Sequence, residues 1–101
     1  MRLGQRPMSE WIQQYGESHR HPVNRWMHTL GIPMIVLSLG LGAAAFAWPG
    51  LGWPAATLFL AGWGLQFVGH AVEGKPPEFF KDWRFLLVGV RWWLAKLQGK
   101  A

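Results

Sequence analysis

The part of the sequence that decides the fold is the uncharged stretch from Trp26 to Val72, WMHTLGIPMIVLSLGLGAAAFAWPGLGWPAATLFLAGWGLQFVGHAV. It contains 47 consecutive residues without Asp, Glu, Lys or Arg. A helix needs about 20 mostly apolar residues to cross a bilayer, so this stretch has room for two. The segment WPGLGWP at residues 48–54 breaks the stretch with two prolines and two glycines, which predicts a turn. We therefore expect a transmembrane helical hairpin with spans at about 29–48 and 53–72; a soluble protein with an unusually apolar core is the alternative.

Composition limits the chemistry of the rest of the chain. Its 101 residues are enough for one domain, 1–101. The absence of cysteine excludes disulfides, Cys-ligated zinc, iron–sulfur clusters and a thiol nucleophile. The net charge of +5 is compatible with nucleic-acid binding, but a modest charge beside a hydrophobic hairpin does not favour it.

All ten Lys and Arg residues lie outside the hairpin, at its open end. The positive-inside rule then predicts cytoplasmic termini and a turn on the far side of the membrane, with Trp48 and Trp53 at the far interface and Trp26 and Trp83 at the near one. The cations also suit anionic lipid headgroups. The first apolar segment starts too late for a cleaved signal peptide. We expect an integral membrane protein, of a bacterial inner membrane in preference to the endoplasmic reticulum of a eukaryote.

Two shorter helices are expected beside the hairpin, which makes the fold class an all-α membrane protein. Ser9 is predicted to cap a surface helix that places Trp11, Tyr15 and Ser18 on one side. Residues 85–97 are apolar but contain two cations, which predicts an amphipathic, interfacial or partly inserted helix. Small residues are expected to let the two spans approach closely: Gly40, Gly42, Ala43, Ala44, Gly62 and Gly64.

The histidines gather at the open end of the hairpin. His28 and His70 flank the turn at similar sequence distances, which predicts similar depths, and His19 and His21 precede the same mouth. Helical spacing places Gln66, His70 and Glu73 on one stripe, and it also pairs Tyr15 with His19 and Asn24 with His28. A polar stripe on a membrane helix must face protein or water. Imidazoles near a carboxylate or carboxamide suit iron, zinc, copper or nickel.

Other interpretations of these residues stay open at this point. A membrane histidine can be a strut between helices, Gln66 an interhelical hydrogen bond, Glu73 a surface ion pair and Tyr15 an interfacial anchor. A b-type haem between His28 and His70, a zinc hydrolase that uses metal-bound water, and a non-catalytic membrane module are the alternative functions.

Two motifs resemble those of a family of small membrane proteins, typified by the fungal endoplasmic-reticulum 2-hydroxy-fatty-acid dioxygenase of phytosphingosine breakdown. The first is Tyr15-x3-His19-x4-Asn24-x3-His28 followed by Gly31-Ile-Pro33, and the second is Gly62-Trp-x2-Gln66-Phe-x-Gly69-His70-x2-Glu73-x2-Pro76. With their surroundings the motifs cover roughly residues 11 to 97.

The resemblance implies an Fe(2+)-dependent α-oxidation, in which a 2-hydroxy fatty acid and dioxygen give carbon dioxide and a fatty acid one carbon shorter. It implies His19, His28 and His70 as metal ligands. Asn24 and Glu73 would complete the site or orient a ring, Tyr15 is a further catalytic candidate, and His21 carries no role. Beside the mouth, Arg20 and Arg25 are candidates to bind the substrate carboxylate, with topology or headgroup binding as the alternative. No extra segment that would hold a long acyl chain is visible in the sequence.

Overall fold

Four helices make up most of the chain in the computed structural model, which describes residues 2–99. Two two-residue strands, β1 (Arg2–Leu3) and β2 (Arg6–Pro7), pair in antiparallel fashion at the N-terminus. The helices and the short 3-10 turns between them follow in the order α1 (Met8–Glu17), α2 (Pro22–Ala44), η1 (Pro49–Leu51), α3 (Gly52–Glu73), η2 (Glu78–Phe80) and α4 (Phe85–Leu97). The predicted all-α class is confirmed.

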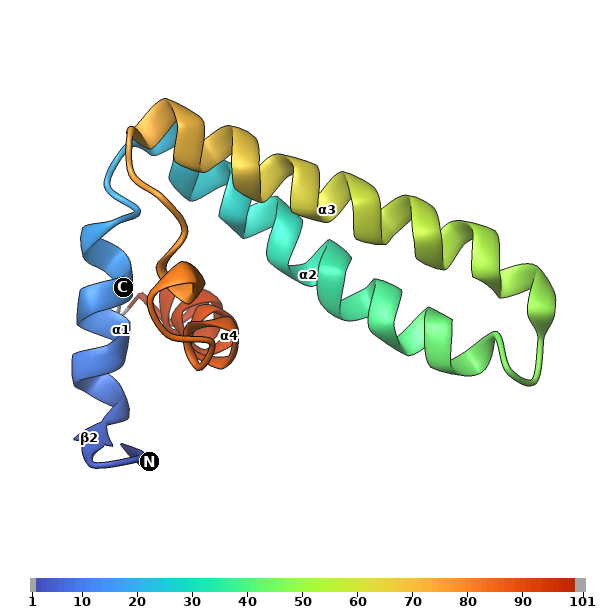
Figure 1. The fold of residues 1–101 in the computed structure, drawn as a ribbon, viewed down its shortest axis with the longest axis horizontal. Coiled ribbons are helices and arrows are strands. Elements are labelled where there is room, and N and C mark those ends of the chain that lie inside the picture. Colours follow the sequence, from blue (N-terminus) through green and yellow to red (C-terminus); the bar gives the residue numbers. More distant parts are fainter. Residues whose placement is uncertain (1, 100–101) are drawn as a thin grey trace.

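The predicted hairpin is confirmed as α2 packed against α3, and it extends as an arm away from the other helices (Figure 1). Its bounds differ from the prediction at the first helix. α2 begins earlier, at Pro22, because proline suits the first helical position and His21 Nδ1 accepts a hydrogen bond from the Val23 amide. α2 also ends earlier, at Ala44; a turn at residues 45–47 follows, and Trp48, which precedes Pro49, has a non-helical backbone (φ −129°, ψ 85°).

Both hairpin helices are long and apolar enough to cross a membrane. Only 22% of the most apolar window of α2 is buried, and 28% of that of the α3 segment. The core helix of a soluble protein buries its apolar side chains, whereas here large ones point outward along the arm, including Leu37, Phe46 and Leu60. At about 1.5 Å per residue, the 23 residues of α2 span about 34 Å, which matches the hydrocarbon thickness of a bilayer. The hairpin therefore has the surface of a membrane-spanning pair.

The close approach of α2 and α3 depends on fewer of the small residues than expected. A Cβ at Gly62 would meet Ile35 and the Gly31 carbonyl, and a Cβ at Gly69 would meet Asn24. By contrast, Gly40, Gly42 and Gly64 have nothing within 4 Å of such a Cβ. The prediction therefore holds at Gly62 and is wrong at these three glycines. Their helix faces point into open space instead of toward the neighbouring helix.

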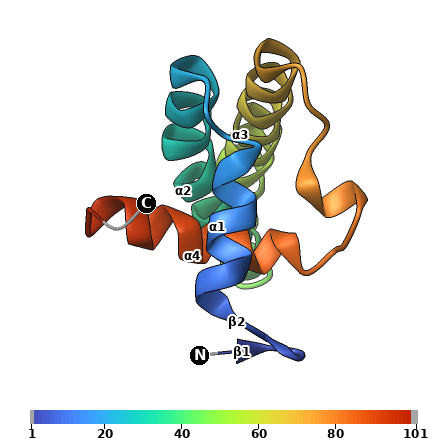
Figure 2. The ribbon, with the colours of Figure 1, turned by 90° about the vertical axis from the view of Figure 1, so that its left-hand side faces the viewer.

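Helices α1 and α4 pack on each other across the open end of the hairpin (Figures 1 and 2). Their shared core contains the rings of Trp11, Tyr15, Phe85 and Trp92. The predicted cap at Ser9 is wrong: α1 begins at Met8, behind Pro7, and has no side-chain cap. The predicted helix at 85–97 is confirmed as α4, whose axis runs across that of the hairpin.

Candidate metal centre

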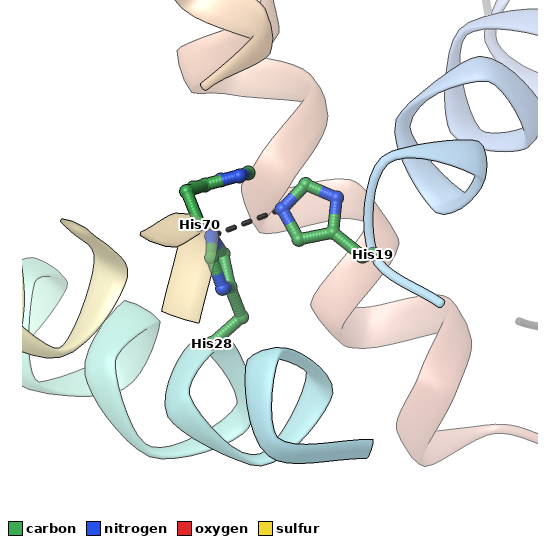
Figure 3. A group of neighbouring side chains, drawn as sticks. All are labelled: His19, His28 and His70. Carbon is green, nitrogen blue, oxygen red and sulfur yellow. Dashed lines mark hydrogen bonds between the residues drawn. The ribbon is translucent and has the colours of Figure 1, made fainter. Parts of the chain in front are cut away.

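Three histidines from three segments meet at the base of the hairpin (Figure 3). His19 lies between α1 and α2, His28 on the second turn of α2, and His70 near the end of α3. One ligand nitrogen from each lies within 4.8 Å of the others. The ring centroids are 4.1 Å apart for His19 and His28, 4.6 Å for His19 and His70, and 4.7 Å for His28 and His70. All three side chains are buried, with exposed fractions of 0%, 2% and 5% in chain order.

Hydrogen bonds on the outer ring nitrogens turn two of these imidazoles inward. His19 Nδ1 lies 2.6 Å from the Tyr15 carbonyl oxygen, and His28 Nδ1 lies 3.0 Å from the Asn24 carbonyl oxygen. A carbonyl only accepts, so each Nδ1 carries the proton and donates it. In a neutral ring Nε2 is then a bare acceptor. The two Nε2 atoms nevertheless face each other at 3.0 Å. At this distance either one ring carries a second proton and donates it to the other, or a metal ion lies beside both nitrogens.

A metal ion fits this arrangement. Two nitrogens bound to one ion at about 2.1 Å lie about 3 Å apart when their bonds meet near a right angle. His70 offers a third ligand nitrogen, because its buried Nδ1 has no hydrogen-bond partner among residues 2–99. Backbone carbonyls that receive the second ring N–H are the usual outer partners of metal-binding histidines. The three histidines could therefore hold one metal ion, and nitrogen donors of this kind suit iron and zinc alike. A haem between His28 and His70 does not fit, because rings 4.7 Å apart leave no room for a macrocycle.

Burial keeps the centre in the neutral state that metal binding requires. Burial lowers the pKa of His19 to about 3, against the opposing effect of its hydrogen bond to the Tyr15 carbonyl. The Tyr15 ring stacks on His19 with centroids 4.0 Å apart and planes inclined by 13°. Burial, and next the negative charge of Glu78, raise the pKa of the Tyr15 hydroxyl above its ordinary value. Tyr15 thus stays protonated beside the histidines.

Asn24 and Glu73 lie behind the histidines and outside the group that could hold a metal. The Asn24 amide nitrogen donates to the Ser18 carbonyl at 3.1 Å and to Glu73 Oε1 at 3.3 Å. The same carboxylate oxygen accepts from the His21 backbone amide at 2.7 Å. These bonds tie the linker that carries His19 to both helices of the hairpin. His21 itself is exposed and caps α2.

An apolar cavity of about 370 Å³ opens from the histidines along the hairpin. Tyr15, His28 and His70 lie at its head, and its walls come from α2, α3, η2 and α4: Ile32, Ile35, Val36, Leu39, Phe59, Trp63, Phe79, Phe85, Leu86, Leu87 and Val90. Gln66 and Glu78 also line it. The Gln66 amide nitrogen, His70 Nδ1 and one Glu78 oxygen are buried without a hydrogen-bond partner in the described chain. Such unpaired groups in one cavity indicate that a polar ligand belongs there.

The two arginines beside the mouth do not line this cavity. Arg25 donates to the His19 carbonyl at 3.3 Å, and its guanidinium carbon lies 5.4 Å from the centre of the Trp92 ring. Arg20 is exposed. The arginines thus surround the site from outside.

Glu78 is the cavity residue that the sequence motifs did not reveal. It lies in η2, between a proline pair and two phenylalanines, and is buried. Helical periodicity does not extend into this loop, so no sequence pattern predicts which way its carboxylate points. Trp92, buried against Tyr15 and His19, also lies outside both sequence motifs.

Residues 5–101 match the model of a protein family described as "Mpo1-like: 2-hydroxy-palmitic acid dioxygenase Mpo1-like". No curated protein and no solved structure matches the chain.

Proposed function

Because the chain belongs to the Mpo1-like family of 2-hydroxy-palmitic acid dioxygenases, we propose that it is an iron(II)-dependent dioxygenase of 2-hydroxy fatty acids. Within its membrane, a bacterial inner membrane in preference to the endoplasmic reticulum, both termini and the open end of the hairpin would face the cytoplasm. The observation that carries the proposal is a cluster of three buried imidazoles, two of which, His28 and His70, line the head of an apolar cavity.

His19 and His28, through Nε2, and His70 would hold the metal. Ferrous iron would supply the redox chemistry that dioxygen requires, together with open positions for dioxygen and for the substrate. The histidine set binds zinc equally well. The activity in the family description is what favours iron, because zinc has no redox chemistry.

The cavity accounts for the acyl chain, for which the sequence offered no dedicated segment. Leu39 on α2 and Phe59 on α3 mark its far end, each eleven residues along its helix from the histidine at the head. At about 1.5 Å per residue these two walls run about 16 Å from the histidines. An extended chain advances about 1.3 Å per carbon, so about a dozen carbons fit along them. A longer tail would continue into the bilayer beside the half-exposed Leu39 and Phe59.

The head of the cavity suits a carboxylate and a 2-hydroxyl. The protonated Tyr15 hydroxyl and the free Gln66 amide can donate hydrogen bonds there. Arg20 and Arg25, outside the cavity, would attract the anionic headgroup toward the mouth. Asn24 and Glu73 would act as positioning residues, because their bonds fix the linker that carries His19.

The reaction balances without a further reductant. A 2-hydroxy acid anion and dioxygen give carbon dioxide, water and the anion of an acid one carbon shorter. The C1–C2 bond breaks, C2 becomes the new carboxyl carbon, and the substrate supplies the four electrons that dioxygen accepts. Exclusion of water by the apolar walls protects this chemistry from side reactions.

Metal content and dioxygen uptake test the proposal together. Protein purified anaerobically in mild detergent would contain near-stoichiometric iron and consume dioxygen with 2-hydroxypalmitate. His28→Ala and His70→Ala would lose both properties, whereas His21→Ala, at an exposed residue, would keep both. Stoichiometric zinc without dioxygen uptake would favour a hydrolase. Protein without any metal would return the histidines to the role of struts between helices.

A further inference from the structure

Glu78 differs from every other acidic side chain in the protein by its surroundings. Glu10 and Glu17 are exposed, Glu73 is bonded to Asn24, and Asp82 pairs with Arg84 at 2.7 Å. Glu78 is only 7% exposed, and it alone among these five carboxylates lines the apolar cavity with His28 and His70. Its Oε2 atom is buried and receives no hydrogen bond from residues 2–99.

The cation nearest to this carboxylate is a weak partner. Lys81 Nζ lies 4.0 Å from Glu78 Oε2, and the lysine side chain is 64% exposed. An ion pair with one solvated member and a long separation contributes little. Glu78 also forms part of the wall of a separate polar cleft, whose lining includes Arg6, Lys75 and Lys81. Its carboxylate therefore stands at the boundary between hydrated cations and the apolar cavity.

A buried carboxylate costs several kcal/mol unless another charge compensates it. The three-histidine centre lacks negative charge, because three neutral imidazoles bring none to a divalent ion. We propose that Glu78 is the anionic counterpart of a divalent metal ion held by His19, His28 and His70, acting across the head of the cavity. The inference requires of the proposed function only that these histidines bind such an ion.

This pairing also explains why the cavity contains no Lys or Arg among its described lining residues. Two positive charges on the ion and one negative charge on Glu78 leave one positive charge at the head. A single substrate carboxylate neutralises it.

The test is a titration of metal-free full-length protein in mild detergent with Co²⁺, whose visible absorption reports the ligand set. The variants are Glu78→Gln, which keeps the shape and removes the charge, and Lys81→Met, which removes the partner lysine. Glu17→Gln is the matched control, because Glu17 lines the polar cleft but not the cavity. Thermal unfolding of each metal-free variant is measured in parallel.

The Co²⁺ dissociation constant of Glu78→Gln is expected to rise about 10- to 100-fold, the usual effect of removing a supporting group near a metal. Lys81→Met and Glu17→Gln should bind as the wild type does, and metal-free Glu78→Gln should be no less stable than the wild type. Equal Co²⁺ affinity of Glu78→Gln and wild type would overturn the inference while leaving the metal centre in place. Equal losses in Glu78→Gln and Lys81→Met, with lower melting temperatures, would assign Glu78 to a structural pair. Wild-type protein that binds no Co²⁺ would end both the inference and the proposed metal centre.

Discussion

The Asn24 amide and the Glu73 carboxylate meet at 3.3 Å, although they lie 49 positions apart in the chain. The bond joins the first turns of α2 to the last turn of α3 at the open end of the hairpin. Because Glu73 also accepts from the His21 amide, and Asn24 donates to the Ser18 carbonyl, both ends of the segment carrying His19 are held. The position of one candidate ligand thus depends on two side chains that lie outside the cluster.

We call the hydrogen bonds of Glu73 to Asn24 and to the His21 amide the brace. Removing the brace should weaken metal binding without changing any candidate ligand. Glu73→Ala leaves the Asn24 amide and the His21 N–H short of an acceptor, so we expect a loss of about 1–3 kcal/mol in unfolding free energy. We also expect about 10-fold weaker Co²⁺ binding, as for other supporting partners of ligands. Glu73→Gln keeps an oxygen acceptor and should restore most of both quantities. If Glu73→Ala bound Co²⁺ as tightly as the wild type, the brace would not position His19.

Blocking the cavity part of the way along should change which chain lengths react. Val36 lines the cavity eight residues from His28, about 12 Å along α2, and the half-exposed position leaves space for a larger side chain. In Val36→Trp we expect kcat/KM for 2-hydroxypalmitate to fall about 10-fold or more while 2-hydroxyoctanoate is still oxidised. The neighbouring Leu37 faces outward and does not line the cavity, so Leu37→Trp serves as the control. Equal chain-length profiles for the two variants would place the acyl chain elsewhere.

The contact between Gly69 and Asn24 makes a strong prediction about stability. A Cβ at Gly69 would collide with the Asn24 side chain and lie 3.2 Å from its Cα, so Gly69→Ala must separate α2 from α3. We expect it to cost about 1–3 kcal/mol, as overpacking does. A Cβ at Gly64 would have no atom within 4 Å. Gly64→Ala should therefore be neutral or stabilising by up to about 1 kcal/mol, because alanine is the better helix former. Thermal unfolding in detergent measures both, and a stable Gly69→Ala protein would contradict the observed packing.

Acid should destabilise the metal-free protein. Burial lowers the pKa of His19 to about 3, below the value of about 6.5 expected in the unfolded chain. The folded state therefore binds fewer protons, and its stability is complete above pH 6.5 and lost as the pH falls. His19 alone should contribute roughly 1 kcal/mol of loss per pH unit between 6.5 and 3. Unfolding measured at pH 7.5, 6.5 and 5.5 checks this, and His19→Gln should flatten the profile; a wild-type stability independent of pH would contradict it.

Local patterns were sufficient for the hairpin and for the helix at 85–97. The 47-residue uncharged stretch favours apolar helices, because in a bilayer the backbone groups would have to bond internally. Capping was less predictable: Ser9 is a good cap in isolation, yet the helix begins at Met8 after Pro7 and the small β1–β2 pairing. The predicted end of α2 was also too late, because the chain leaves the helical conformation before Pro49, sooner than hydrophobicity suggests.

By itself, the sequence determined the class of the molecule and the candidate ligands. Charge distribution and apolar length are properties of the chain, and the spacing of His19, His28 and His70 places them at one end of any antiparallel hairpin. Only the tertiary structure decided that their rings meet within 4.8 Å, that Asn24 and Glu73 stand behind them, and that Glu78 lies at the head of an apolar cavity. The reason is that these contacts join separate segments of the chain, and no single helical periodicity runs through those segments. Their geometry follows from how α1, α4 and the η2 loop pack against the hairpin, and no local pattern specifies that packing.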